Sequence, residues 1–156
     1  FLATSISCCS PFGINTPMTR SFPNASTRSA ATILESFTPE MTIGNFVTME
    51  DWCHIGCINK VEIGDGTMIA SKVFITDHFH GSIVSEDLTF GRPALRPLSS
   101  KPVKIGQNVW IGEGVSIMPG VTLGDNVIVG ANSVVTHSFE SNVVIAGCPA
   151  RIINNI

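Results

Sequence analysis

The stretch from Ile105 to Glu140 repeats every six residues, and this period constrains the fold more than any other feature of the chain. An amphipathic helix places apolar residues three, four and seven positions apart, so a period of six argues against one. Short strands joined by turns do fit, because each strand sends the same two places inward on every pass. The first place of each hexad is aliphatic, and these residues are Ile105, Ile111, Ile117, Leu123, Val129 and Val135. The stretch therefore predicts a solenoid of stacked strands.

The same period occurs earlier in the chain, beginning at Ile43 and again at Ile63. Three hexads follow each start, with first places at Ile43, Met49, Ile55, Ile63, Ile69 and Ile75. Three hexads per turn would make a triangular prism whose coils hold about 18 residues each. The fifth place is mostly small and is expected to pack inside. The fold class predicted is all-β, a parallel β-helix.

Two segments interrupt or precede the repeat. Residues 81–102 have no six-residue pattern and are punctuated by glycine and proline, which predicts a loop inserted into the solenoid. Long loops without their own periodicity are usually functional, as a lid or a partner arm. Residues 1–40 are rich in Ser, Thr, Pro and Asn, and we predict an irregular N-terminal cap or first coil there. The β-helix domain is then 41–156.

Composition narrows the function classes. The chain of 156 residues has the length of about one domain, and its net charge of −3 carries no polybasic signature for nucleic acid. Only 13% of residues are charged, so we expect a partner to cover part of the surface, as in an oligomer. No apolar run reaches the ~18 residues needed for a transmembrane segment. The N-terminus lacks the basic region of a signal peptide, and the five cysteines are an odd number, so we expect a cytoplasmic location.

Three stretches of the sequence resemble the hexapeptide-repeat acyltransferases. The resemblance to the coenzyme-binding half of the maltose and galactoside acetyltransferases lies in KPVKIGQNVWIGEGVSIMPGVTLGDNVIVGANSVV, and the closing signature of that branch is matched by AGCPARII. The surface-polysaccharide O-acetyltransferases are resembled by CHIGCINKVEIGDGTMIASKVFITDHFHGS. Right-handed crossovers are the general rule for parallel strands, but the resemblance implies a left-handed parallel β-helix. It also implies a homotrimer that uses acetyl-CoA as co-substrate and a saccharide as acceptor.

The family's catalytic histidine matches His78, within ITDHFHG just before the loop. O-Acetylation needs a base for the acceptor hydroxyl, and neutral histidine suits that task near pH 7. Asp77 could orient the ring, although neighbours on a strand point to opposite faces and a backbone carbonyl would serve equally well. His80 shares the strand parity of His78 and is the rival base, or an acceptor contact. The alternative for His78 is an exposed turn histidine.

Residues before the second coil are candidates for acceptor binding. The resemblance makes His54 a sugar contact, with a solvated turn histidine as the alternative. Trp52 is either a stacking platform for a sugar ring or an outer-face packing residue, and we favour packing. The cysteines on either side of His54 suggest zinc, but a structural zinc site needs four tetrahedral ligands. Cys53 falls in an inward fifth place, so we expect it in the core and predict no metal.

The coenzyme would lie along small residues that let pantetheine approach the backbone, namely Gly112, Gly130, Ala131, Ala146 and Gly147. These residues could equally well form only the corners of the prism. By resemblance, Trp110 lies beside the pantetheine arm and Arg151 near the coenzyme phosphates, where a guanidinium pairs well. At Thr136–His137 the family usually has Lys or Arg after the threonine, and this departure would weaken a phosphate contact.

The function expected is an acetyl-CoA-dependent O-acetyltransferase acting on a saccharide of a capsule, lipopolysaccharide or exopolysaccharide precursor. The same fold also hosts N-acetyltransferases for xenobiotics or amino sugars, and these are the runner-up. A zinc hydratase of the γ-carbonic anhydrase type would need three converging histidines, and the spacing of His54, His78 and His80 does not match that motif. A non-catalytic β-helical scaffold is the remaining alternative.

Overall fold

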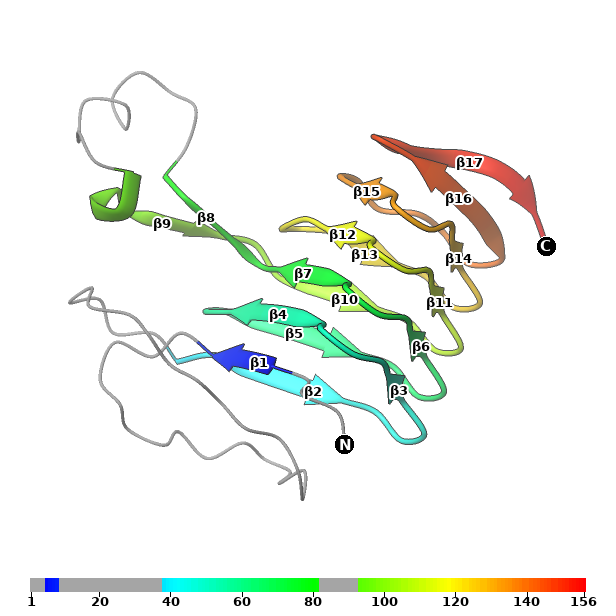
Figure 1. Ribbon diagram of the computed structural model, residues 1–156, viewed down its shortest axis with the longest axis horizontal. Coiled ribbons are helices and arrows are strands. Elements are labelled where there is room, and N and C mark those ends of the chain that lie inside the picture. The colour runs from blue at the N-terminus through cyan, green and yellow to red at the C-terminus, as the bar shows by residue number, and fades with distance from the viewer. Residues whose placement is uncertain (1–4, 9–37, 82–92) are drawn as a thin grey trace.

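The fold is a stack of short parallel strands that wind around three faces of one solenoid. The computed structural model describes residues 5–8, 38–81 and 93–156 (Figure 1). Face A carries β1 (Ser5–Cys8), β4 (His54–Cys57), β7 (Phe74–Thr76), β12 (Ser116–Ile117) and β15 (Val134–Val135). Face B carries β2 (Glu40–Ile43), β5 (Lys60–Ile63), β10 (Val103–Ile105) and β13 (Thr122–Leu123). Face C carries β3 (Thr48–Met49), β6 (Met68–Ile69), β11 (Trp110–Ile111), β14 (Ile128–Val129), β16 (Val143–Gly147) and β17 (Ala150–Asn155).

The register of the strands places the first residue of every hexad above its counterpart in the coil below. On face A, Ile55, Ile75 and Ile117 are direct partners in consecutive parallel pairs. On face B the same holds for Ile63 and Ile105. Three hexads per turn and an all-β parallel solenoid are thus confirmed. The left hand implied by the resemblance stays a prediction.

The interior is filled by the two inward places of each hexad. The aliphatic first places from Ile55 onward are fully or almost fully buried, and so are the fifth places Val109, Val115, Val121, Val127 and Ser133. The first places Ile43 and Met49 are partly buried and pack against this core. Cys53 lies in the same core, as expected from its fifth place. Burying one such aliphatic side chain contributes roughly 1.5–3 kcal/mol of transfer free energy. The stacked rows therefore supply the main stabilising term.

Close stacking also explains the glycine in the second place of the hexads. A Cβ built on Gly106 would lie 2.7 Å from the carbonyl carbon of Gly124 in the next coil. No side chain fits in that space. The turn tips that follow have a positive φ, and asparagine, which tolerates this region, occupies them at Asn108, Asn126, Asn132 and Asn142.

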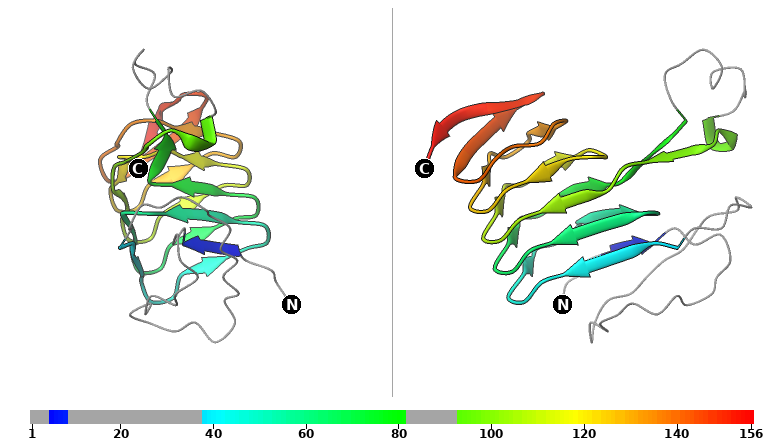
Figure 2. Two further views of the ribbon diagram at one scale, coloured as in Figure 1. Left: turned by 90° about the vertical axis from the view of Figure 1, so that its left-hand side faces the viewer. Right: turned by 180° about the vertical axis from the view of Figure 1, so that it is seen from behind.

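The repeat is interrupted between β7 and β10, where the chain leaves the stack. Strands β8 (His78–His80) and β9 (Leu98–Ser100) pair antiparallel, and a short 3₁₀ helix at Pro93–Leu95 precedes β9. Figures 1 and 2 show this hairpin, here called the arm, projecting away from the coils. The segment predicted as a loop thus includes an ordered strand, because antiparallel pairing has no six-residue signature. Its residues 82–92 lie outside the described part.

The ends of the chain differ from the regular coils. Strand β1 pairs with β4, so part of the segment 1–40 contributes a strand to face A, and β2 begins at Glu40. The possible helix or coil at 29–37 lies outside the described residues. At the other end, β17 turns back at Pro149 and pairs antiparallel with β16. In the part of the chain that the structure describes, no helix has the length and apolarity to span a membrane.

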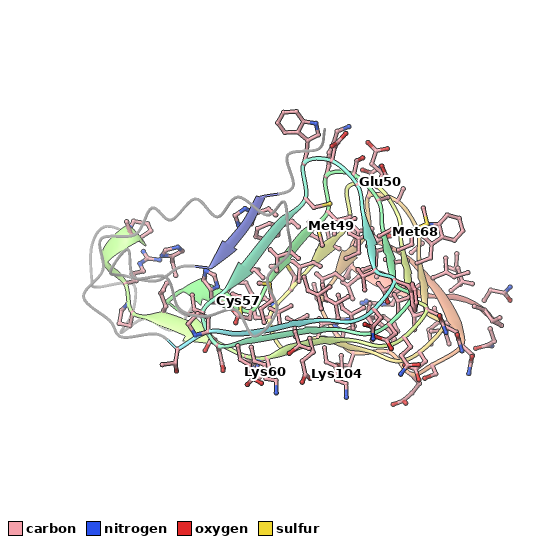
Figure 3. The ribbon with its side chains drawn as sticks, turned by 90° about the horizontal axis from the view of Figure 1, so that it is seen from below. Met49, Glu50, Cys57, Lys60, Met68 and Lys104 are labelled. Carbon is pink, nitrogen blue, oxygen red and sulfur yellow. The ribbon has the colours of Figure 1, made fainter. Side chains whose placement is uncertain are left out.

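The three faces differ in their outward residues. Face B carries charged side chains, where Lys60 bridges Glu62 at 3.0 Å and Lys104 is aligned with Glu62. Figure 3 shows Lys60 and Lys104 on one side of the solenoid and Met68 on another. Face C presents an apolar row, formed by Met68, Trp110, Ile128 and Val144. The outward rows of faces B and C thus differ in polarity.

The aliphatic stack makes a prediction about stability. We expect Ile117→Ala, in the middle of face A and fully buried, to lower the free energy of unfolding by about 2–5 kcal/mol. The matched control is Ile153→Ala on β17, where the side chain is 64% exposed, with an expected change within about 0.5 kcal/mol. Urea unfolding monitored by circular dichroism measures both. Equal losses would contradict a core built from these rows.

Candidate active site

The site begins where the chain leaves face A, at the bend formed by Asp77 between β7 and β8. In an uninterrupted strand, Asp77 and His78 would point to opposite faces. The bend breaks that alternation, and Nδ1 of His78 lies 2.9 Å from Oδ1 of Asp77. A carboxylate, rather than a backbone carbonyl, is thus the partner of this ring nitrogen. The hydroxyl of Thr76 lies 3.3 Å from the same nitrogen.

The side chain of Asp77 is fully buried, yet its carboxylate is well supplied with donors. The backbone N–H groups of Ile58 and Asn59 donate to it at 3.0 and 2.7 Å. Burial by itself would raise the pKa of Asp77, but the hydrogen bond from His78 and the two backbone N–H groups outweigh it, so this pKa is lowered. The carboxylate therefore stays ionised at neutral pH.

An ionised carboxylate can only accept hydrogen bonds, and this determines the tautomer of His78. Nδ1 must carry the proton that is donated to Asp77, which leaves a lone pair on Nε2 of the neutral ring. The His78 side chain is 13% exposed, and the described residues give Nε2 no hydrogen-bond partner. The arrangement can therefore accept a proton at Nε2 from a group that approaches the solenoid.

Asp77 also holds the base of the arm through its backbone. Its N–H donates to the carbonyl of Gly56 at 3.1 Å, and its carbonyl accepts from the N–H of Lys101 at 2.8 Å. Asn59 reaches the arm as well, where its side-chain amide donates to the hydroxyl of Ser100 at 3.3 Å. The site and the root of the arm are therefore one structure.

The two other histidines that we predicted for the site lie beside His78. The ring of His80, two residues along β8, has its centroid 6.4 Å from that of His78 and is exposed. His54 lies on the neighbouring strand β4, is exposed, and stacks on Phe74 with centroids 5.4 Å apart. Its Nε2 lies 3.7 Å from the point where a Cβ of Gly56 would be, and Cε1 of His78 lies 3.1 Å from that point. The structure thus gathers His54, His78 and His80 around one corner of the solenoid.

Trp52 is the aromatic residue that we predicted either to bind a sugar ring or to pack on the outer face. The side chain is 73% exposed at the turn between β3 and β4, where its φ of 63° places it at a turn tip. The side chain thus packs little against the residues that the structure describes, and its role as a sugar platform or an outer-face packing residue stays a prediction. It remains available as a contact for another molecule.

The residues predicted for the coenzyme fall in three places. Gly112, Gly130, Ala131, Ala146 and Gly147 line the corner between faces C and A. A Cβ on Gly112 would lie 2.7 Å from the backbone nitrogen of Ala131, so at least this glycine is required by coil stacking. Trp110 is 51% exposed on face C, whereas Thr136 and His137 follow β15 at the corner between faces A and B.

Arg151 on β17 reaches across to that second corner. One of its guanidinium nitrogens, Nη1, donates to Nε2 of His137 at 2.8 Å and to the carbonyl of Ala150 at 2.8 Å. Arginine has no acceptor atom, so Nε2 of His137 is the acceptor in this contact. Nδ1 of His137 lies 3.0 Å from the hydroxyl of Thr136. The departure from Lys or Arg at position 137 thus places an imidazole against Arg151.

The cysteines of the first coil are directed to backbone carbonyls. Sγ of Cys53 lies 3.1 Å from the carbonyl oxygen of Ala70, and Sγ of Cys57 lies 3.5 Å from that of Glu40. Within residues 5–8, 38–81 and 93–156, no three His, Cys, Asp or Glu side chains lie close enough together to hold a metal ion.

Sequence reasoning missed several groups of this site. They are Gly56, Phe74, Thr76 and the backbone N–H groups of Ile58 and Asn59. A glycine inside the strand HIGC was the one available signal, because strand interiors rarely favour glycine. Phe74 and Thr76 lie on β7 just before Asp77, whereas Ile58 and Asn59 belong to the preceding coil, and none of them carries a motif of its own.

Comparison with known proteins identifies the family. The model described as bacterial transferase hexapeptide (six repeats) matches residues 102–137. The WbbJ protein of Escherichia coli K12, provisionally named a lipopolysaccharide biosynthesis O-acetyl transferase, is 52% identical over 110 residues, or 69% of this chain and 56% of that protein. The chain belongs to the hexapeptide-repeat acetyltransferase family. The predicted resemblance is thereby confirmed.

Two solved members of the hexapeptide-repeat acetyltransferase family share the fold. A maltose O-acetyltransferase from Clostridium difficile 630 is 40% identical, with a TM-score of 0.67 over 74% of this chain and 59% of that one. A galactoside acetyltransferase, solved in complex with coenzyme A, is 39% identical with a TM-score of 0.67, over 74% of this chain and 55% of that one. The chain therefore spans 55% to 59% of the length of these three relatives.

The buried Asp77 carboxylate should make the free energy of unfolding depend on pH in the acid range. The folded pKa of Asp77 is lowered, so between that value and the unfolded pKa of about 3.9 the unfolded chain binds more protons. The stabilisation of the folded state by the Asp77 charge is thus complete above about pH 4. It is lost as the pH falls through the folded pKa of Asp77. We expect Asp77→Asn to remove this term and to lower the free energy of unfolding at pH 7 by about 1–3 kcal/mol.

Urea unfolding at pH 7, 5, 4 and 3 measures the effect of Asp77→Asn. A matched control is Asp125→Asn, since exposed Asp125 also accepts a backbone N–H, from Gln107 at 2.8 Å. We expect the control to lose less at pH 7 and to keep the acid dependence of the wild type. Parallel pH curves for the wild type and Asp77→Asn would argue against a stabilising charge at Asp77.

Proposed function

We propose that the chain is an acetyl-CoA-dependent O-acetyltransferase that transfers an acetyl group to a hydroxyl of a saccharide. The observation that carries this proposal is the Asp77–His78 pair, which leaves a lone pair on Nε2 of His78 at the surface of the solenoid. The names of the relatives support it, since they include a maltose O-acetyltransferase and a galactoside acetyltransferase bound to coenzyme A.

His78 acts as general base in this proposal. As the acceptor oxygen attacks the thioester carbonyl, its proton passes to Nε2 of His78 and the new C–O bond forms. Asp77 holds the ring in the required tautomer and stabilises the imidazolium. The C–S bond then breaks, and the leaving thiolate takes the proton back from Nε2. No acyl-enzyme is needed, because the base activates the acceptor directly.

The acceptor would lie at the corner that carries His78. We assign His54, His80 and Trp52 to acceptor contacts, because two of them flank His78 and the third is an exposed aromatic at the start of face A. A saccharide offers hydroxyls for the imidazoles and an apolar ring face for the indole. The E. coli relative favours a lipopolysaccharide precursor over the other surface polysaccharides.

The coenzyme is assigned to Trp110, to the small residues of the corner between faces C and A, and to Arg151 with Thr136 and His137. Trp110 lies on face C, whereas His78 lies at the corner between faces A and B. Because these are different sides of one solenoid, a site that uses both must take them from two copies of the chain. In a ring of three copies, one face of each copy packs against a different face of its neighbour. Such a ring would bring the two sides together in one site.

The homotrimer is therefore part of the proposal. The outward residues of the strands on face B include the charged side chains Lys60, Glu62 and Lys104, while the outward row of face C is apolar from Met68 to Val144. Such a division fits a solenoid that keeps one face in water and turns others toward neighbours. A cytoplasmic location remains our expectation, since an odd cysteine number favours a reducing compartment.

Replacement of His78 tests the base. We expect His78→Ala to lower kcat by about 10²–10⁴-fold while acetyl-CoA still binds, because the imidazole takes part in the chemical step only. The assay is release of free thiol from acetyl-CoA in a screen of mono- and oligosaccharide acceptors, with amino sugars and simple amines included. Calorimetry with coenzyme A verifies binding.

His80→Ala separates the two candidate bases. We expect its main effect on the KM for the acceptor, with kcat reduced less than tenfold. Near wild-type turnover of His78→Ala would overturn the base assignment. Turnover confined to amines would replace the O-acetyltransferase by an N-acetyltransferase, and a wild-type protein that binds no acetyl-CoA would favour the non-catalytic scaffold.

A further inference from the structure

Gly56 lies inside a strand, at a place where the backbone does not call for glycine. It belongs to β4, and its φ is not among the positive values found at Gly66, Gly81, Gly114, Gly120 and Gly147. A glycine in a strand interior weakens the strand and often marks the close approach of another group. The reason for Gly56 must therefore lie in what surrounds it.

The neighbours of Gly56 are the side chains of the candidate site. Ile55 and Cys57 are buried in the core, so alternation turns position 56 outward. A Cβ there would lie 3.1 Å from Cε1 of His78 and 3.3 Å from the hydroxyl oxygen of Thr76. By contrast, Gly64 and Gly112 lie against the backbone of the next coil. At Gly56 the missing side chain makes room for an imidazole.

The contact with Cε1 affects how the ring can be oriented. In a planar imidazole, Cε1 lies between Nδ1 and Nε2. Nδ1 is already bound to Asp77 at 2.9 Å, and Cε1 lies 3.1 Å from the place that a Cβ at position 56 would take. The bond at Nδ1 and the space left at position 56 together set the direction of Nε2.

We propose that Gly56 is a positioning residue that sets the plane of the His78 imidazole and so aims Nε2 at the acceptor. This inference rests on the proposed role of His78 as the base. Gly56 contacts no substrate in this scheme, and it acts only by leaving the space that the ring edge occupies.

A methyl group at position 56 should act on the chemistry and not on the fold. Contacts of 3.1 and 3.3 Å require the ring to move by a few tenths of an ångström, and it would pivot on the bond from Nδ1 to Asp77. Reaction rates fall steeply when reacting groups are displaced by this order of distance, so we expect Gly56→Ala to lower kcat about tenfold. The KM for acetyl-CoA should not change. The Tm should stay within about 3 °C, because alanine suits a strand better than glycine.

The direct test observes the ring itself. The protein is labelled with ¹³C-histidine, and the Cε1–H signals of its four histidines are recorded from pH 5 to 9, with His78 assigned by its loss in His78→Ala. We expect Gly56→Ala to shift the Cε1–H signal of His78 more than those of His80 and His137. The matched control is Ser116→Thr, which adds a methyl to a half-buried residue of face A, at the register position of Phe74. It should leave the His78 signal and kcat unchanged.

The outcomes separate this inference from the proposed function. If Gly56→Ala leaves both the His78 signal and kcat unchanged, the inference is wrong. If all four histidine signals shift and the Tm falls by more than about 5 °C, Gly56 is a structural residue and the inference is also wrong. If the His78 signal shifts but His78→Ala keeps wild-type turnover, the geometry holds and the base assignment fails.

Discussion

The stacking of parallel coils in one register is the constraint on which the rest of the structure depends. Each aliphatic first place lies on its counterpart in the coil below, as Ile75 lies on Ile55 and below Ile117. A strand cannot gain one residue within the ladder without moving the inward side chains that follow to the outside. An inserted segment must therefore leave the stack and return to it at a corner. The arm does this, and after it β10 pairs with β5 in the same register as the other coils.

This constraint concentrates the chemistry at the corner where the arm leaves. Asp77 connects the two structures there, since its backbone joins Gly56 and Lys101 while its carboxylate joins Ile58, Asn59 and His78. A buried carboxylate is costly unless it is fully hydrogen-bonded, and here three donors satisfy it. One residue thus stabilises the root of the arm and determines the tautomer of the proposed base.

The difference in polarity between the outer rows of faces B and C bears on the proposed assembly. Charged residues such as Lys60 and Lys104 lie on face B, and an apolar row that includes Met68 and Trp110 lies on face C. If the assembly is a trimer, a neighbouring copy would cover this apolar row. Trp110 and His78 lie on different sides of one solenoid, so the proposed reaction would take them from two copies.

The sequence by itself determined the architecture. A period of six, with its inward first and fifth places, was sufficient to predict a solenoid of stacked strands, the buried rows and the break after residue 80, because burial repeats with the coil. That the coil has three sides was established by the sheet topology. The motif at His78 also predicted which residue to consider as base. It did not predict the ordered strand β9 within the arm, since antiparallel pairing has no such period.

Only the tertiary structure decided how the site is built. Alternation along a strand placed Asp77 and His78 on opposite faces, and a local bend brings them to 2.9 Å. The ring edge of His78 lies beside the space left by Gly56 of the preceding coil, and Trp52 is exposed at a turn tip. Such contacts depend on the register between coils and on single backbone angles. A repeat pattern records neither, because it reports only which places face inward.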